Sequence, residues 1–189
     1  MNWEARYQAE RTPWERPTLN PAFVTWRVSG TLLPCRILLP GAGRSGEPLA
    51  LARDGFDVTV VDSAPTALGV QRARFEAAGV AAAFHGADLL SWAAPAPFAA
   101  IYDQTCLCAL PPDSWPVYVS RLHEWLLPGG VLFILLMQTG VAGGPPYDCP
   151  LADMRTLFAA GWLWSDTVPP AVGSPGVGQA EIPVTLTRL

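Results

Sequence analysis

The sequence predicts an α/β fold in which seven mostly parallel strands form one doubly wound sheet, with helices on both faces. From residue 31 onwards, short apolar runs alternate with segments of helical period, as in parallel strands joined by right-handed crossovers. The first apolar run leads directly into a glycine-rich turn, which is typical of a nucleotide-binding sheet. From Gly161 to Leu189 two strand-like runs follow each other without a helix, so we expect an antiparallel C-terminal hairpin.

Hydrophobic periodicity sets the expected boundaries of the elements. The strands are expected at Arg36–Leu39, Asp57–Val61, Ala82–His85, Ala99–Asp103, Val131–Met137, Trp162–Thr167 and Pro183–Thr187. The helices are expected at Glu47–Asp54, Pro65–Ala78, Trp115–Trp125 and Leu151–Ala160. The connection between the last two strands, Pro169–Glu181, is rich in Pro and Gly and has no helical period, which favours an antiparallel last strand.

The first 30 residues differ from the rest. A short helix is expected within Asn2–Glu10, with Trp3 and Tyr7 one turn apart on one face, and Trp14 follows a break. Three prolines exclude a long regular helix in this segment: Pro13, Pro17 and Pro21. The aromatic residues either pack on the core as a strap or form a lid whose rings face a cofactor, and composition does not decide between these two interpretations.

The glycine turn and the acid after it predict a nucleoside site. Gly41, Gly43 and Gly46 fit the G-x-G-x-x-G pattern between a strand and a helix, and Asp62 ends the next strand about 20 residues after the first glycine. A carboxylate at that place accepts hydrogen bonds from ribose hydroxyls. The alternatives are a purely structural turn and a solvated acid at a strand end.

Further acids follow other strand ends, where ligands of such sheets bind. Asp62-Ser63, Asp88-Leu89 and Asp103 stand just past three strands, and they suit a ligand with hydroxyl groups, an exocyclic amine and an ammonium group. Helix capping is the structural alternative for Asp62 or Ser63 and for Asp88.

Composition restricts the class of protein. A length of 189 residues fits a single domain, residues 1–189, with little room for a separate substrate domain. The net charge of −4 and the pI near 5.1 argue against a nucleic-acid surface. Charged residues near the N-terminus do not fit a signal peptide, and no run approaches 18 apolar residues, so we expect a soluble cytoplasmic protein that does not bind membranes, as a monomer or weak dimer.

The cysteines do not indicate a metal site. The chain has four cysteines without C-x-x-C spacing, so reduced thiols are expected. Cys106 and Cys108 lie two residues apart, but they lack the third and fourth ligands that zinc requires. We therefore expect no bound metal.

Several strings together resemble the thiopurine S-methyltransferase family, in particular its branch of plant and bacterial thiol and halide methyltransferases. The resemblance covers residues 1 to about 165, and its most specific strings are T-P-W-E and G-G-P-P-Y. The matching residues are, in order, Trp3 and Tyr7, Thr12-Pro13-Trp14-Glu15, Leu39-Pro40-Gly41-Ala42-Gly43, Asp62, Gly86-Ala87-Asp88, Tyr102-Asp103, Cys108-Ala109-Leu110, Leu127-Pro128-Gly129-Gly130 and Gly143-Gly144-Pro145-Pro146-Tyr147.

This resemblance implies a Rossmann-like class I methyltransferase fold that uses S-adenosylmethionine. It assigns the cofactor to residues of the lid, the glycine turn and the strand ends: Trp3, Tyr7 and Trp14 over the methionine part, Gly41 and Gly43 at the cofactor backbone, Asp62 and Ser63 at the ribose, Asp88 and Leu89 at the adenine, and Asp103 at the methionyl ammonium group. It places the acceptor pocket at Trp14, Pro145, Pro146 and Tyr147.

The expected reaction is direct in-line transfer of a methyl group to a small soft nucleophile, such as a thiol, a thiopurine or a halide. A thiol is partly ionised at neutral pH and a halide carries no proton, so a general base is not required; Asp103 and Tyr147 are the nearby candidates. The chain departs from the family pattern in two ways: only two residues precede Trp3, so a more open site is expected, and Pro169–Glu181 contains no Arg.

Two alternatives to a methyltransferase stay open at this point. An NAD(P)-dependent oxidoreductase also fits the glycine turn with Asp62, although the missing substrate domain and the terminal hairpin speak against it. A regulator that binds S-adenosylmethionine without catalysis would share the same fold.

Overall fold

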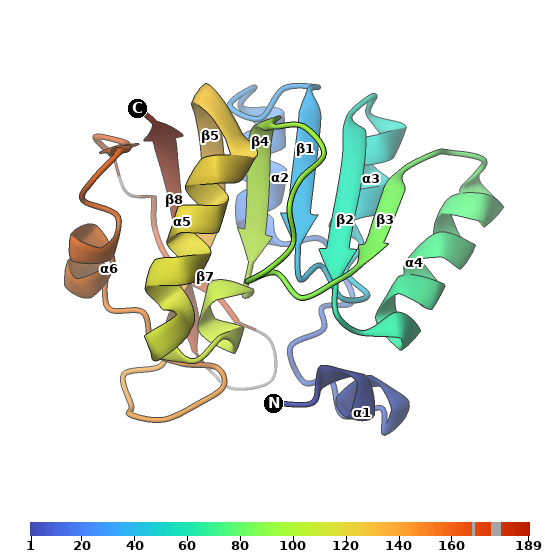
Figure 1. Cartoon of the computed structure of the whole chain (residues 1–189), viewed down its shortest axis with the longest axis horizontal. Helices are drawn as coiled ribbons and strands as arrows, with labels where there is room; N and C mark the ends of the chain where they lie inside the picture. Colours follow the sequence, from blue (N-terminus) through green and yellow to red (C-terminus); the bar gives the residue numbers. More distant parts are fainter. Residues whose placement is uncertain (168, 175–178) are drawn as a thin grey trace.

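A computed structural model describes residues 1–167, 169–174 and 179–189. Its strands form one sheet in the order β3-β2-β1-β4-β5-β8-β6, with β7 paired to β8 (Figure 1). The strands are β1 (Arg36–Pro40), β2 (Asp57–Asp62), β3 (Ala83–Gly86), β4 (Phe98–Gln104), β5 (Leu126–Gln138), β6 (Trp162–Trp164), β7 (Val172–Gly173) and β8 (Ala180–Arg188). The helices are α1 (Trp3–Gln8), α2 (Pro21–Val28), α3 (Glu47–Arg53), α4 (Pro65–Ala78), α5 (Trp115–Trp125) and α6 (Leu151–Leu157), with 3-10 turns at Leu107–Ala109 and Pro112–Ser114.

The parallel part of the sheet brings several strand ends to one edge. β1 pairs in parallel with β2 on one side and with β4 on the other, so the strand order reverses at β1. β3 and β5 extend the parallel ladder on the two sides. A doubly wound sheet binds its ligands at the carboxyl ends on either side of such a reversal.

The antiparallel hairpin is confirmed, because β8 lies antiparallel between β5 and β6. The predicted count of seven strands differs from the structure, because the described residues form a sheet of eight. The additional strand, β7, comprises only Val172 and Gly173, opposite Glu181 and Ala180. It lies in the connection predicted at Pro169–Glu181, of which residues 175–178 lie outside the described residues. Two residues are too few to show a strand period in a sequence.

Helix α2 was not predicted. Its proline, Pro21, occupies the first turn, where the missing N–H costs no hydrogen bond. The side chain of Asn20 caps the helix by accepting a hydrogen bond from the amide of Ala22 at 2.9 Å. Phe23 and Trp26 are buried one turn apart. Pro21, which we expected to exclude a long regular helix, is therefore the first residue of this short one.

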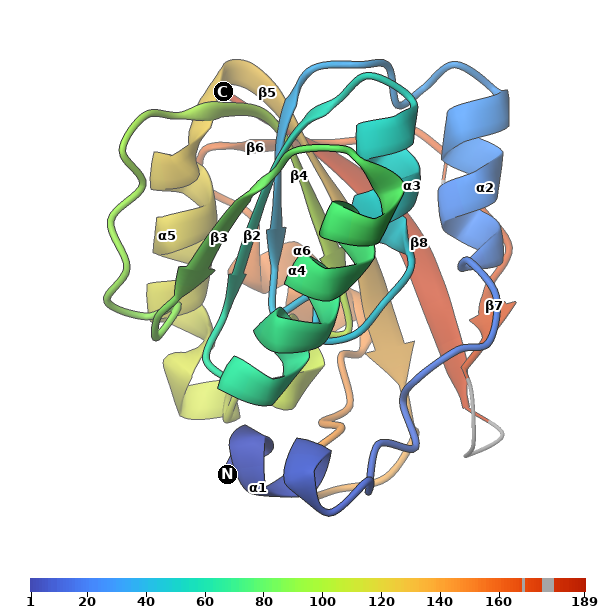
Figure 2. The ribbon, with the colours of Figure 1, turned by 90° about the vertical axis from the view of Figure 1, so that its right-hand side faces the viewer.

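The sheet separates two hydrophobic cores, which confirms helices on both faces (Figures 1 and 2). One core packs α5 and α6 against the sheet and includes Tyr118 and Met154. The other packs α2, α3 and α4 and includes Trp26 and Phe75. Helix α1 belongs to neither core and lies beyond the carboxyl ends of the strands (Figure 1). Within the described residues, every helix is too short or too polar to cross a membrane.

Candidate functional site

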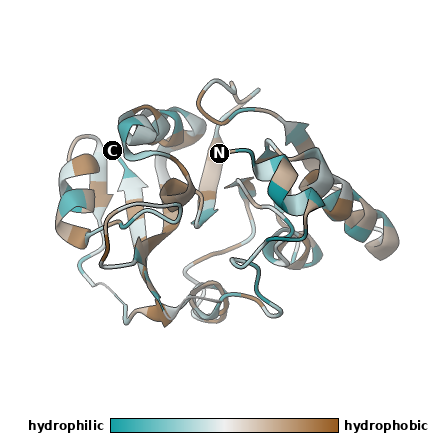
Figure 3. Cartoon of the chain, turned by 90° about the horizontal axis from the view of Figure 1, so that it is seen from below, coloured by the Kyte–Doolittle hydropathy of each residue, from teal (hydrophilic) through white to brown (hydrophobic). Residues whose placement is uncertain are grey.

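A cavity of about 560 Å³ lies at the carboxyl ends of the parallel strands, between the sheet and the N-terminal segment. Figure 3 views the molecule from this side, with the N-terminus toward the viewer. The cavity wall includes most of the predicted site residues: Trp3, Tyr7, Trp14, Gly41, Gly43, Asp62, Ser63, Asp88, Leu89, Pro145 and Pro146. Residues from opposite ends of the chain thus share one cavity.

The glycine turn is closely packed against other side chains. Gly41 and Gly43 have φ angles of +57° and +54°, which L side chains rarely adopt. A Cβ atom on Gly41 would lie 2.8 Å from the sulfur of Cys106, and one on Gly43 would overlap the hydroxyl oxygen of Tyr7. The missing side chains of the two glycines therefore leave room for Cys106 at Gly41 and for Tyr7 at Gly43. Tyr7 belongs to the N-terminal segment.

Asp62 ties the glycine turn to the start of α4. Its carboxylate accepts hydrogen bonds from the amide of Gly43 and from the amide of Ala64, each at 2.8 Å. The residue is buried, and this burial raises the pKa of its carboxyl group. Asp62 is therefore not a solvated acid at a strand end, and Ala64 rather than Asp62 is the N-cap residue of α4. Asp62 stabilises the turn before α4 and lines the cavity.

The residues after β3 form the adjacent wall. Leu89 is buried, and Asp88 is exposed. Asp88 accepts a hydrogen bond from the amide of Leu90 at 3.0 Å through one carboxylate oxygen, as in an Asx turn. No helix begins among the described residues between β3 and β4, so Asp88 is not a helix cap. Both residues line the cavity next to Asp62 and Ser63.

The three N-terminal aromatic residues pack on one another. The ring of Trp14 stands edge-on to Trp3 and to Tyr7, with centroid distances of 5.4 Å and 5.8 Å. The indole nitrogen of Trp14 donates a hydrogen bond to the Tyr7 hydroxyl at 3.3 Å. They rest on Ala64 and Ala67 at the start of α4, apart from the two main cores. The three rings therefore do not form a strap on a main core, and all three line the cavity.

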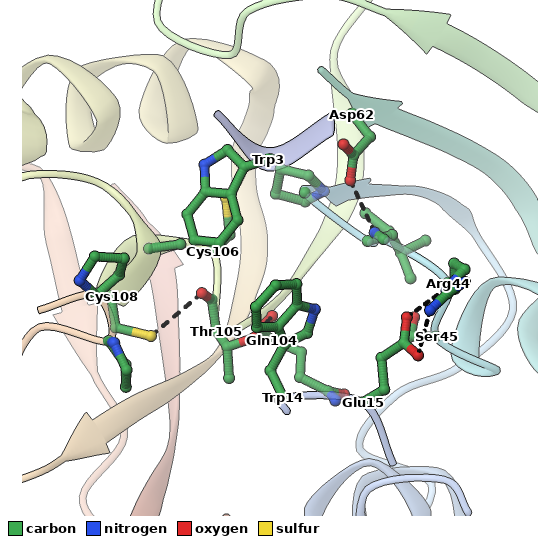
Figure 4. A pocket seen from close by; sticks show the side chains of 18 of the residues that line it. Trp3, Trp14, Glu15, Arg44, Ser45, Asp62, Gln104, Thr105, Cys106 and Cys108 are labelled. Carbon is green, nitrogen blue, oxygen red and sulfur yellow. Dashed lines mark hydrogen bonds and ion pairs between the residues drawn. The ribbon is translucent and has the colours of Figure 1, made fainter. Parts of the chain in front are cut away.

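The N-terminal segment is fastened to both sides of the cavity. On the glycine turn, Arg44 makes an ion pair with Glu15 at 2.6 Å (Figure 4). It makes a second ion pair with Glu10 at 3.0 Å. At the start of α4, the carboxylate of Glu4 accepts hydrogen bonds from the hydroxyl and the amide of Thr66, which lower the pKa of Glu4. These contacts connect the N-terminal segment to the glycine turn and to the first turn of α4.

Asp103 and Tyr147 are the predicted site residues that the structure does not place on the described cavity wall. Asp103 is fully buried and accepts hydrogen bonds from the Tyr118 hydroxyl and the Cys106 amide, each at 2.9 Å. Burial raises its pKa to about 6. The side chains of a strand alternate between two faces, so Asp103 turns into the core while Gln104 reaches the cavity.

Tyr147 likewise faces its own loop. Its amide donates a hydrogen bond to the carbonyl oxygen of Cys108 at 2.8 Å. A Cβ atom added to Gly144 would lie 2.8 Å from the Tyr147 ring, so the ring packs on that glycine. The two preceding residues, Pro145 and Pro146, are the ones that line the cavity.

Sequence reasoning missed several residues of the cavity wall. Thr105, Cys106 and Cys108 follow β4, and Thr105 has a φ of +62°, which is strained for a β-branched residue (Figure 4). Burial raises the pKa of both thiols well above its usual value, so they stay protonated. Their position directly after the fourth strand was the available signal. Within the described residues, no cluster of His, Cys, Asp or Glu is arranged to hold a metal ion.

Sequence comparison relates the chain to known enzymes. The model of the family described as thiopurine S-methyltransferase matches residues 1–184. A probable thiol methyltransferase of Arabidopsis thaliana is 29% identical over 159 residues, which cover 82% of this chain and 70% of the relative. A thiopurine S-methyltransferase of Pseudomonas paraeruginosa is 29% identical over 180 residues, which cover 85% of this chain and 82% of the relative.

Structural comparison gives the same fold. The chain superposes with a TM-score of 0.78 on the 1,6-didemethyltoxoflavin-N1-methyltransferase of Burkholderia thailandensis, crystallised with its substrate and S-adenosylhomocysteine. The two are 21% identical, and the match covers 97% of this chain and 84% of the other. At this identity the likeness shows the fold alone.

Proposed function

Since the chain belongs to the thiopurine S-methyltransferase family, we propose that its cavity binds S-adenosylmethionine beside a small sulfur nucleophile. The protein is an S-adenosylmethionine-dependent methyltransferase. A nicotinamide-dependent oxidoreductase and a regulator without catalysis are not favoured by these relatives. The observation that carries the proposal is the single cavity that joins the glycine turn and Asp62 to the aromatic lid.

The cavity wall fits the parts of this cofactor. Both oxygens of Asp62 accept backbone hydrogen bonds, yet a carboxylate has about four acceptor positions, so ribose hydroxyls find acceptors at Asp62 and a further partner in Ser63. Asp88 and Leu89 offer an acceptor and an apolar surface to adenine. Rings near a sulfonium group attract it by about 0.5–2 kcal/mol, and this role falls to Trp3, Tyr7 and Trp14.

The proposed acceptor side of the cavity is lined by apolar residues. Trp14, Pro145 and Pro146 line the cavity together with Leu110 and Met137. Such walls favour a compact, polarisable acceptor, and we propose a thiol, a thiopurine or a halide.

The reaction needs little from ionisable side chains. When bound, S-adenosylmethionine supplies a methyl group on a sulfonium centre, which a nucleophile takes by in-line displacement. The lid and the two prolines exclude water and align the reactants, which favours a transition state with dispersed charge. A thiol with a pKa of about 8.5 is already a few per cent thiolate at pH 7. We therefore assign no general base, and Asp103 stabilises the loop after β4 instead.

A methyl-transfer assay tests this function. The protein is incubated with S-adenosylmethionine that carries a labelled methyl group and, separately, with a small thiol, a thiopurine and iodide. Labelled product from at least one of these acceptors is expected, with release of S-adenosylhomocysteine. Cofactor binding without product from the whole panel would favour the regulator, and binding of NAD instead would favour the oxidoreductase.

We further propose that residues 1–189 act as one domain, in the cytoplasm and as a monomer or weak dimer. Of the predicted lid segment, residues 1–30, only the part before α2 acts as the lid, because Phe23 and Trp26 of α2 belong to a main core. The net charge of −4 supports small-molecule rather than nucleic-acid partners. Light scattering after size-exclusion chromatography measures the oligomeric state, and a stable larger assembly would contradict this proposal.

A further inference from the structure

Helix α4 holds the glycine turn through Gln71, a residue in the middle of the helix whose side chain is fully buried. The side-chain nitrogen Nε2 of Gln71 donates hydrogen bonds to the carbonyl oxygens of Gly43 and Ser45, each at 2.9 Å. Both acceptors belong to the turn between β1 and α3. One buried amide group therefore binds two peptide groups of that turn.

These two bonds fix the orientation of the Gln71 amide. A carbonyl oxygen only accepts hydrogen bonds, so the group that faces Gly43 and Ser45 is the donor NH₂. The Oε1 atom of Gln71 is buried and, within the described residues, has no hydrogen-bond partner. A buried acceptor without a partner costs free energy, and an apolar side chain of similar length would avoid that cost. Packing alone therefore does not explain a glutamine at this position.

The contacts turn backbone carbonyl groups of the glycine turn toward α4. Gly43 and Ser45 line the cavity, whereas Gln71 is not among the described residues of the cavity wall. The carbonyl oxygens of Gly43 and Ser45 therefore face the helix rather than the cavity. Arg74, about one helical turn after Gln71, donates a hydrogen bond to the carbonyl oxygen of Arg44. Three successive carbonyl groups of the glycine turn are thus bound by side chains of α4.

The backbone of Gly43 is held on both of its polar groups. Its amide donates a hydrogen bond to the carboxylate of Asp62 at 2.8 Å, and its carbonyl oxygen accepts one from Gln71. Glycine has access to many backbone conformations, and Gly43 adopts a φ of +54°. Asp62 and Gln71 together select this conformation. Asp62 also lines the cavity, while Gln71 acts through the turn.

We propose that Gln71 is a positioning residue, which holds the glycine turn in the conformation that receives S-adenosylmethionine. The proposal rests on the proposed function and goes beyond it, because it gives a role in cofactor binding to a side chain behind the cavity wall. The apparent affinity of a site falls with the fraction of molecules that hold the binding conformation. A turn without Gln71 would therefore lose affinity although its own contacts with the cofactor are unchanged.

Calorimetric titration of Gln71→Met with S-adenosylhomocysteine tests the proposal. Methionine has a similar length and donates no hydrogen bond. The affinity is expected to fall about 10-fold, as for the loss of one or two hydrogen bonds between uncharged groups. The binding stoichiometry is expected to stay the same, because every folded molecule still has the site. In the methyl-transfer assay, KM for S-adenosylmethionine should rise by a similar factor, while kcat changes less than about 2-fold.

A second variant, Gln71→Glu, gives a readout that a merely structural role would not change. A protonated carboxyl group can donate to one of the two carbonyl oxygens, whereas an ionised carboxylate opposes both of them with acceptors. Burial holds the pKa of the introduced carboxyl group above its ordinary value of about 4.3. The affinity of Gln71→Glu relative to the unmodified protein should therefore be about 10-fold lower at pH 8 than at pH 5. This ratio cancels the titration of Asp62 and Asp103, which both proteins share.

Proteolysis without a ligand reports the glycine turn directly. Cleavage by trypsin after Arg44 requires the turn to open, so Gln71→Met should be cut there faster than the unmodified protein. Glu76→Gln, on the exposed face of α4, is the matched control and should leave both affinity and cleavage unchanged. Thermal unfolding of all variants reports their folding.

The outcomes separate a positioning role from a structural one. In folded Gln71→Met, unchanged affinity, unchanged cleavage, or a lower stoichiometry at unchanged affinity would overturn the assignment. A ratio for Gln71→Glu that does not depend on pH would also overturn it. If the unmodified protein bound no S-adenosylhomocysteine, the proposed function itself would fail, and faster cleavage of Gln71→Met would then show only that Gln71 stabilises the turn.

Discussion

Arg44 of the glycine turn and Glu15 of the N-terminal segment face each other in a bidentate ion pair, with Nε–Oε1 and Nη2–Oε2 distances of 2.6 Å and 3.0 Å. Arg44 is largely buried at this contact, with 13% of its side chain exposed. A bidentate guanidinium–carboxylate pair is directional as well as attractive. The turn that is proposed to carry the cofactor and the lid that covers the cavity therefore move as one unit while this pair holds.

Removal of the Arg44 side chain should loosen the lid. In Arg44→Met we expect the affinity for S-adenosylhomocysteine to fall about 10-fold, since a charged hydrogen-bonded pair contributes on the order of 1.5–3 kcal/mol. Trypsin should also cleave after the exposed Arg11 faster than in the unmodified protein. Arg53→Met, at the exposed end of α3, is the control. Unchanged affinity and unchanged cleavage would show that the aromatic packing alone holds the lid.

Gly43 and Tyr7 should be coupled. Gly43→Ala places a Cβ atom on the Tyr7 hydroxyl oxygen, while the next ring atom would be 3.4 Å away. The single variant should lose S-adenosylhomocysteine binding more than 10-fold, and Gly43→Ala combined with Tyr7→Phe should regain part of it. The regained part measures the steric contact, and the remainder reflects the positive φ, about 1–2 kcal/mol. If the double variant binds S-adenosylhomocysteine no more tightly than Gly43→Ala, the whole loss of affinity comes from the backbone conformation.

Asp62→Asn should weaken both the turn and the nucleoside site. The side-chain oxygen of Asn can accept a hydrogen bond from the backbone N–H of either Gly43 or Ala64. The side-chain NH₂ group then faces the other N–H, so two donors oppose each other. We expect a loss of about 1–3 kcal/mol in the free energy of unfolding and a loss of affinity for 5′-methylthioadenosine as well as for S-adenosylhomocysteine. Urea denaturation and calorimetry measure the two effects. Retained affinity for 5′-methylthioadenosine would remove Asp62 from the ribose site.

Asp103 should make stability depend on pH. Its pKa in the folded protein is about 6 against an ordinary value of 3.8, so between these values the folded state binds more protons than the unfolded state. The free energy of unfolding should therefore fall as the pH rises from about 4 to above 6, by on the order of 3 kcal/mol from this group. Asp103→Asn removes this dependence, and the difference between the two urea-denaturation curves across pH isolates it from Asp62. Parallel pH profiles of the two proteins would refute the assignment.

The sequence alone predicted the elements that regular periodicity encodes. The bounds of α4 and α5 agree with the predicted ranges, and the residues after β1, β2 and β3 line the cavity as expected. Strand-end positions follow from topology, because parallel strands present their carboxyl ends at one edge.

The sequence did not predict which way some side chains point or which residues far apart in the chain are in contact. Neighbouring side chains of a strand point to opposite faces of the sheet, so either Asp103 or Gln104 faces the cavity. Which of the two does so depends on how β4 is oriented in the sheet. The ion pair of Arg44 with Glu15, and that of Arg16 with Glu181, join segments far apart in the chain. No periodic pattern encodes such pairs, so the sequence did not predict these two ion pairs.

Among the hydrophobic residues that the structure describes, the aromatic cluster of Trp3, Tyr7 and Trp14 packs with Ala64 and Ala67 and shares no buried residue with the main cores. Cooperative unfolding units follow such divisions in packing, and amide hydrogens exchange through the opening of the unit that contains them. The amides of α1 should therefore exchange through a low-energy opening that leaves the sheet protected. Product could then leave, and fresh cofactor enter, at a rate set by this local opening rather than by unfolding of the protein.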